Sequence, residues 1–269
     1  MEIIDKNNKL GESPVWNHFN NILYWVDIDG YDIKEYSDER GIIAHHMTNK
    51  PTCISLIDTN NLFVAVENGL GIYDFRCNNY TYVHTIDDSN VRMNDGKCDR
   101  NGNLYIGTMH RNEDTGHTGS IYQYISSSKH IEPVFTSIGI SNGLSFSKNN
   151  EKMYYSDSST GCLYSINRNN NEKILMRQYD GIAPDGSTVD INDNYYSALW
   201  GGYGIDIYQN DMIFGKIELP CKFTTCCCFG GVDMDRLFIS SAYNDPIDNG
   251  LLLSIPTSTY GIKETPISL

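Results

Sequence analysis

The sequence predicts an all-β protein, a six-bladed β-propeller with four-stranded antiparallel blades around a central channel. Three features predict it: a weak helical periodicity, frequent strand-like runs between Asn, Asp and Gly turns, and a unit that recurs six times. Apolar residues rarely recur at helical spacing over more than two turns, whereas short β-branched and aromatic runs are common. The 19 tyrosines suit the half-buried surfaces of pleated sheets.

The recurring unit consists of a strand-like stretch, an Asn-, Asp- or Gly-rich turn, and a second strand-like stretch. Stretches such as RMNDGKCDRNGNLYIGTM and ISNGLSFSKNNEKMYYSDS show it most clearly. The six copies cover residues 11–28, 51–67, 92–109, 140–158, 182–200 and 224–242.

Each copy has an anchor, the residue that precedes its first predicted strand. Successive anchors are 40, 42, 48, 43 and 40 residues apart, which is the size of one four-stranded propeller blade. Six such units nearly fill the 269 residues, so we expect one domain over residues 1–269 with a large buried core. The anchors are Glu12, Thr52, Asn94, Asn142, Asp185 and Thr225.

The N-terminal stretch MEIIDKNNK precedes the first full unit. We expect it to pair with the last blade, which would close the ring and remove an exposed sheet edge. A closed propeller has no edge that must pair with another chain, so no obligatory protein partner is expected.

Composition excludes several classes of function. Lys and Arg number 20 against 34 Asp and Glu, a net charge of −14, and no basic stripe marks a surface for nucleic acid or an anionic membrane. No window approaches the eighteen or so apolar residues of a membrane span, and the N-terminus lacks a secretory signal. Eight cysteines are too sparse for a disulfide scaffold, so we expect a reducing, cytoplasmic environment.

The stretch CKFTTCCCFGG places four thiols within eight residues. It lacks the paired C-x-x-C spacing and the neighbouring histidine of a structural zinc site, so we interpret these cysteines as small buried hydrophobes of a strand. Trp16, Trp25 and Trp200 lie within strand-like runs and are expected in the core.

The first strand of each propeller blade is the innermost, so the anchors should converge on the channel. Glu12, Asn142 and Asp185 would bring two carboxylates and an amide carbonyl to one channel mouth. Crowded carboxylates repel one another unless a cation offsets their charge. A shell of oxygen donors suits calcium, magnesium or manganese, and zinc with oxygen ligands remains possible. No histidine is an anchor, which disfavours an imidazole-bound zinc.

Ordinary turns offer a second interpretation of three of these stretches. Asn94-Asp95-Gly96, Asn142-Gly143 and the APDGS stretch around Asp185 all read as turns in which Asn or Asp bonds its own backbone. Glu12 favours the ligand interpretation, because no turn requires a glutamate at that position.

Taken together, LGESPVW, RMNDGKCDRNGNLYIGTM, ISNGLSFS, APDGSTVD and TTCCCFGG resemble the regucalcin/gluconolactonase family of six-bladed propeller lactonases, over essentially the whole chain. The resemblance implies that Glu12, Asn142 and Asp185 hold one divalent cation, and that Arg92 and Asn94 contact the substrate. It also implies an acidic substrate contact shortly after GTM. Here that position holds Asn112 with Glu113 next to it, which departs from the family pattern.

The chemistry implied is hydrolysis of a small-molecule sugar lactone, such as glucono-, galactono- or arabinono-lactone, to an aldonic acid. A bound divalent cation would polarise the carbonyl and activate a water, Asp185 would act as general base, and Arg92 would stabilise the oxyanion.

Two alternatives remain open at this stage. One is hydrolysis of another ester or an organophosphate at the same cation, which a hydrophobic mouth would favour. The other is a calcium-binding regulatory propeller, in which the cation is structural or sensed. Arg92 bears on that choice, since a substrate clamp needs a cationic side chain and a structural calcium site does not, although Arg92 could also pair with a neighbouring carboxylate.

Overall fold

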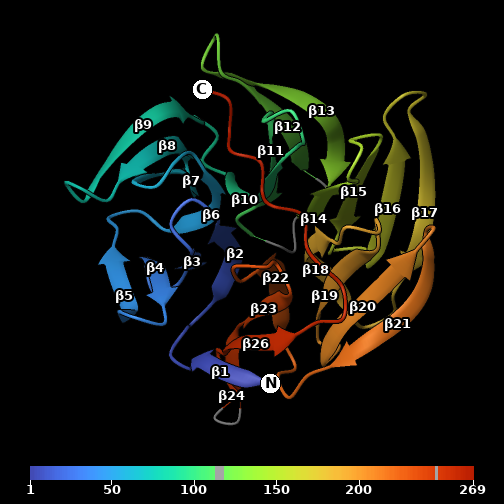
Figure 1. Ribbon diagram of the computed structural model, residues 1–269. Coiled ribbons are helices and arrows are strands. Elements are labelled where there is room, and N and C mark those ends of the chain that lie inside the picture. Colours follow the sequence, from blue (N-terminus) through green and yellow to red (C-terminus); the bar gives the residue numbers. More distant parts are fainter. Residues whose placement is uncertain (113–117, 246–247) are drawn as a thin grey trace.

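The computed structural model describes residues 1–112, 118–245 and 248–269. These residues form strands, turns and irregular segments without a helix, so none of them provides a helix able to cross a membrane. Six four-stranded antiparallel sheets surround a central axis, and Figure 1 shows them as the blades of a ring. The predicted six-bladed β-propeller is therefore confirmed.

Blades 1 to 5 each follow the chain outward from the axis, starting with an innermost strand. Blades 1 to 3 comprise β2 (Gly11–Asn17), β3 (Ile22–Asp27), β4 (Asp32–Ser37) and β5 (Gly41–His46); β6 (Pro51–Leu56), β7 (Asn61–Val66), β8 (Gly69–Asp74) and β9 (Asn79–Thr85); and β10 (Val91–Cys98), β11 (Leu104–His110), β12 (Gly119–Ile125) and β13 (His130–Ile138). Blades 4 and 5 comprise β14 (Ser141–Phe146), β15 (Lys152–Asp157), β16 (Cys162–Asn167) and β17 (Glu172–Gln178); and β18 (Ala183–Val189), β19 (Tyr195–Trp200), β20 (Gly204–Gln209) and β21 (Met212–Glu218).

Blade 6 is built from both ends of the chain. It comprises β22 (Thr224–Gly230), β23 (Arg236–Ser241), β26 (Leu252–Pro256) and β1 (Glu2–Asp5), with the short pair β24 (Tyr243–Asp245) and β25 (Asp248–Asn249) set beside it. The N-terminal strand β1 pairs antiparallel with β26 and forms the outer edge of this blade. The prediction that the N-terminal stretch closes the ring on the last blade is therefore confirmed.

Short polar turns connect the first and second strands of the blades. In four of them an Asn or Asp side chain accepts a hydrogen bond from the backbone N–H two residues later, at 2.7–3.0 Å. These residues are Asn17, Asp58, Asp99 and Asp190. Such side-chain turns help to reverse the chain and explain the recurring Asn and Asp of the repeat.

The hydrophobic core lies mainly between neighbouring blades. One cluster joins Val15, Tyr24 and Val26 of blade 1 to Leu62 and Val64 of blade 2, and the other clusters follow the same pattern around the ring. Because each blade buries its apolar faces only against its neighbours, the stability of the ring depends on its closure.

Tryptophan and cysteine provide a check on the predicted core. Trp16 and Trp25 are buried as expected, with 8% and 0% of their surface exposed. All eight cysteines are free, and those in the CKFTTCCCFGG stretch are buried in or next to β22. The interpretation of these cysteines as buried small hydrophobes is confirmed.

The C-terminal segment, residues 257–269, crosses from blade 6 toward blade 3, as the red trace in Figure 1 shows. It contacts the far ends of innermost strands and the turns after them: Gly261 bridges to Asp190, and the N–H groups of Ile267 and Ser268 donate to the carbonyls of Leu56 and Gly102. Within the channel, buried Glu264 forms an ion pair with Lys97 of β10. The segment therefore covers the channel at the end away from the strand starts.

Candidate active site

A cavity of about 440 Å³ lies at the opposite end of the channel, where the innermost strands start. Its walls come from the starts of β2, β10, β14 and β18 together with the ends of second strands. The lining residues are Leu10, Glu12, Ile28, Arg92, Asn94, Met109, Ile140, Asn142, Ser158, Ser159, Ala183, Asp185 and Trp200.

The anchors lie within the innermost strands and not in turns before them. Each innermost strand has a register shift at its anchor, for example between Glu12 and Val15 in β2 and between Asn142 and Ser145 in β14. A β-bulge of this kind changes the direction of a side chain. The interpretation of Asn94, Asn142 and Asp185 as turn residues is therefore wrong, because each lies inside a strand that pairs with its neighbour on both sides of the register shift.

Left-handed backbone conformations mark two of these bulges. Ser13, next to Glu12, has a φ of 47°, and Gly143, next to Asn142, has a φ of 63°. A Cβ atom at Gly143 would lie 2.7 Å from the hydroxyl of Tyr195, so both conformation and space require glycine there. The Asn-Gly pair thus reflects bulge geometry that places the Asn142 side chain in the cavity.

The structure brings five of the seven predicted site residues into this one cavity: Glu12, Arg92, Asn94, Asn142 and Asp185. Asn112 is exposed beyond the end of β11, where its backbone N–H donates to Nδ1 of His110, and it does not line the cavity. Glu113 lies outside the described residues. The other two anchors, Thr52 and Thr225, are buried in strands β6 and β22 and have no place in the lining.

A chain of hydrogen bonds crosses three blades along the polar side of the cavity. The guanidinium of Arg92 donates to Oδ1 of Asn94 at 2.9 Å, and Nδ2 of Asn94 donates to Oδ1 of Asn142 at 2.8 Å. Nδ2 of Asn142 then donates to Oγ of Ser158, which donates to the carbonyl of Pro184 beside Asp185. The chain fixes the orientation of both amides before any ligand binds.

The two predicted carboxylates affect each other electrostatically. Removal from water, and then the charge of Asp95, raises the pKa of Glu12 to about 8. Removal from water, followed by the charges of Glu12 and Asp95, raises the pKa of Asp185 well above its usual range. Arg92 lowers both pKa values by a smaller amount, which places its positive charge within reach of both groups. The cavity therefore concentrates negative charge that the protein offsets only in part.

This donor set fits a divalent cation. Among the residues that the structure describes, no three His, Cys, Asp or Glu side chains gather closely enough to hold a metal ion. The amide oxygen of Asn142 would be the third protein donor beside Glu12 and Asp185. That oxygen has two lone pairs and can accept from Asn94 while facing an ion. Two buried carboxylates, of which Glu12 raises the pKa of Asp185, with a neutral amide oxygen beside them, suit a hard cation better than a metal that prefers thiolate or imidazole ligands.

Asp95 is a carboxylate that sequence reasoning treated only as part of a turn. Its Oδ1 accepts from the N–H of Gly96 at 2.8 Å and its Oδ2 from the N–H of Leu144 at 2.9 Å, so it joins blade 3 to blade 4. Removal from water raises its pKa to about 6 in spite of these bonds. The signal was present in RMND, where the acidic residue directly follows the anchor Asn94.

Trp200 also differs from the prediction. It was expected in the core, but it is only partly buried and lines the cavity. It is the last residue of β19 and pairs with Ala183, at the mouth end of the blade. Met109 is the last residue but one of β11 and also lines the cavity. The repeat in the sequence could therefore have indicated that residues at the ends of second strands lie near the site.

Comparison with known proteins relates this geometry to a family. The family model described as the SMP-30/gluconolactonase/LRE-like region matches residues 10–243. A putative sugar lactone lactonase of Bacillus subtilis is 30% identical, over 96% of this chain and 95% of that protein. A pentonolactonase of Haloferax volcanii is 27% identical, over 90% of this chain and 85% of that protein. The crystal structure of a calcium-binding protein, regucalcin, from Agrobacterium tumefaciens matches with a TM-score of 0.91 and 26% identity, over 99% of this chain and 97% of that one.

Proposed function

The chain belongs to the SMP-30/gluconolactonase/LRE-like family, and we propose that it hydrolyses sugar lactones to aldonic acids with one bound divalent cation. The observation that carries this proposal is the meeting of Glu12, Asn142 and Asp185 with Arg92 in one cavity. Similarity to a putative sugar lactone lactonase and to a pentonolactonase supports the same reaction.

Glu12, Asn142 and Asp185 would hold the cation, which when bound supplies a Lewis acid for the lactone carbonyl and lowers the pKa of a water. Asp185 takes a proton from the attacking water through a carboxylate oxygen. The water oxygen bonds to the carbonyl carbon, and the bond from that carbon to the ring oxygen then breaks. The ring oxygen takes up a proton and leaves as the hydroxyl of the aldonic acid.

Arg92 stabilises the negative charge that develops on the carbonyl oxygen during this attack. Asn94 holds its guanidinium in place through the 2.9 Å hydrogen bond and orients the lactone. Asn112, which follows β11 in the sequence, would reach substrate hydroxyls only from outside the cavity, because it is exposed and does not line it; Glu113 is proposed for the same substrate contact. The eight free cysteines support a reducing compartment such as the cytoplasm as the place of the reaction.

The test of this function is a panel of aldonolactones and simple esters, assayed by acid release after chelation and re-addition of calcium, zinc, manganese or magnesium. Several kcal/mol of Lewis-acid stabilisation correspond to a loss of at least about a hundredfold in turnover on chelation, restored by one or more of these ions. Turnover that is indifferent to the chelator would contradict the cation-dependent mechanism.

Arg92 distinguishes an enzyme from a calcium-binding regulatory propeller, an alternative that the similarity to regucalcin, a calcium-binding protein, keeps in view. We expect Arg92→Ala to reduce kcat by about 10²–10³-fold, the usual effect of removing one oxyanion donor. Cation affinity should change less than tenfold, because Arg92 donates to Asn94 and is not itself a ligand. Arg92→Lys should restore only part of the activity, since lysine keeps the positive charge but cannot donate two parallel hydrogen bonds as a guanidinium does. An unchanged kcat in Arg92→Ala would show that Arg92 has a structural role and does not stabilise the oxyanion.

A further inference from the structure

Apolar side chains form a rim around the mouth of the cavity. We call these six residues the apolar rim: Leu10, Ile28, Met109, Ile140, Ala183 and Trp200. Three of them precede a polar site residue by two positions: Leu10 precedes Glu12, Ile140 precedes Asn142 and Ala183 precedes Asp185. Because alternate residues of an extended chain share a face, each of these three lies on the same side of its strand as the polar residue and nearer the mouth.

Backbone pairing between neighbouring blades fixes this rim. Isolated bridges join Leu10 to Ala242, Met109 to Ile140 and Trp200 to Phe223. The Trp200 ring also packs against the Phe223 ring, with centroids 4.7 Å apart. The rim is therefore a preformed surface, and substrate binding need not order it.

Few of the described lining residues outside the cation site can donate to substrate hydroxyls. Ser158 Oγ donates to the Pro184 carbonyl at 2.7 Å, and Ser159 Oγ donates to a carboxylate oxygen of Asp157 at 2.7 Å. Both hydroxyl hydrogens are thus committed to protein acceptors. A hydroxyl placed against the rim would leave water without gaining a full set of partners, which is unfavourable.

We propose that the site prefers lactones whose exocyclic substituent is apolar, above all deoxy-aldonolactones that carry a methyl group where the parent sugar lactone carries a hydroxymethyl group. This inference rests on the proposed function, which holds the ester carbonyl near Glu12, Asn142 and Asp185. In such a lactone the ring carbon that carries the exocyclic substituent is bonded to the ring oxygen, so the substituent lies beside the reacting ester bond, in a cavity whose other walls include Trp200 and Met109.

The experiment compares fuconolactone with galactonolactone of the same configuration, since the two differ only by one hydroxyl group. We expect kcat/KM to be at least about tenfold higher for fuconolactone, the lower end of the discrimination that apolar pockets achieve for one small group. Trp200→Gln should reduce this ratio to near one. The control is Phe214→Ala, which removes an exposed aromatic residue of the same blade outside the cavity and should leave the ratio unchanged.

The wild-type comparison requires no variant to fold. A ratio of one or below, with both lactones hydrolysed, would overturn the inference and leave the lactonase function intact. A high ratio that survives in folded Trp200→Gln would overturn the assignment to the rim. If the enzyme, loaded in turn with each of the four cations, hydrolyses no lactone, the proposed function itself fails.

Discussion

Glu12→Gln and Asp185→Asn are each expected to reduce lactone turnover by at least about a thousandfold, in line with the loss of one member of a catalytic unit. Each substitution removes one of the two carboxylates that, among the described residues, line the cavity beside the amide of Asn142. Asp185→Asn also removes the proposed base. Titration calorimetry with each cation should give no measurable binding to either variant, and circular dichroism should retain the β-sheet spectrum.

The matched control is Glu172→Gln, which removes a carboxylate from the exposed strand β17. It changes the net charge by the same amount as Glu12→Gln and should leave turnover and cation binding unaltered. Retained turnover in Glu12→Gln, with the control behaving like the wild type, would contradict the assignment of the cation site.

Glu12→Gln should also change the pH dependence of the protein's stability. The pKa of Glu12 is raised from its ordinary value of 4.5 to about 8 in the folded protein. Between these values the folded state binds more protons than the unfolded state, so the stability of the chelated protein should fall as pH rises from about 4.5 to about 8. Glu12→Gln should flatten this dependence and raise the melting temperature of the chelated protein at pH 8.

Repeat phase explains why the sequence predicted most of the site. Glu12, Asn94, Asn142 and Asp185 occupy equivalent positions of four blades. Because the blades are arranged in a ring, residues at equivalent positions of the innermost strands lie close together around the axis. Trp200 was misassigned because a tryptophan at the end of a strand looks the same in sequence whether it faces the core or the cavity. Its role depends on Phe223, 23 positions further on, which holds the ring at the rim.

The channel closure at the other end had no sequence signal. Residues 257–269 lack the repeat, and the partner of Glu264 is Lys97, in a blade on the far side of the axis. Contacts of this kind depend on the path of the chain across the assembled ring, which no local pattern encodes. Asp95 was missed for a related reason, because its hydrogen bond to Leu144 joins two blades.

The concentration of negative charge at the site lowers the stability of the fold, and other parts of the molecule must offset this cost. Burial and the charge of Asp95 raise the pKa of Glu12, and burial with the charges of Glu12 and Asp95 raises the pKa of Asp185, so ionising these carboxylates for function opposes stability at the channel mouth. A single blade cannot offset this cost by itself, because the apolar clusters that stabilise the ring lie between blades. The contact between blade 6, where the two ends of the chain meet, and blade 1 closes the ring. We call this contact the seam, and it carries a large share of the ring's resistance to opening.

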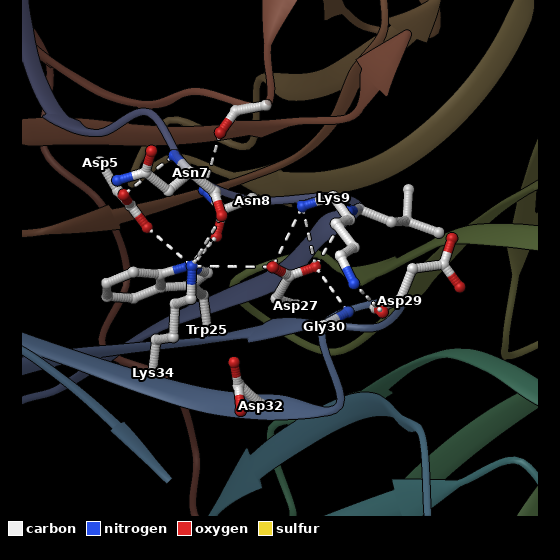
Figure 2. A network of polar contacts seen from close by, with 12 residues as sticks. Asp5, Asn7, Asn8, Lys9, Trp25, Asp27, Asp29, Gly30, Asp32 and Lys34 are labelled. Carbon is white, nitrogen blue, oxygen red and sulfur yellow. Dashed lines mark hydrogen bonds and ion pairs between the residues drawn. The ribbon is translucent and has the colours of Figure 1, made fainter. Parts of the chain in front are cut away.

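A buried lysine holds that seam, and Lys34→Ala is expected to destabilise the protein by about 3–5 kcal/mol, the usual cost of breaking a buried ion pair. Lys34 lies on β4 of blade 1, and its Nζ is 2.9 Å from Oδ2 of Asp5, which ends β1 in blade 6. It also donates to Oδ1 of Asn8 at 2.9 Å and lies 3.7 Å from Oδ2 of Asp27. Figure 2 shows its ammonium group at the centre of this network.

The size of the effect follows from burial on both sides of the pair. The side chains of Lys34 and Asp5 are only 8% and 4% exposed, so Lys34→Ala leaves the carboxylates of Asp5 and Asp27 together without a cation. Urea unfolding should report the loss, equivalent to roughly 6–20 °C in Tm for a domain of this size. The exposed pair Lys50–Asp29, also 2.9 Å long, is the control, and Lys50→Ala should cost less than about 1 kcal/mol. The double variant Lys34→Ala/Asp5→Ala should lose less stability than the two single variants together. Equal losses of stability in Lys34→Ala and Lys50→Ala would show that the seam does not depend on this network.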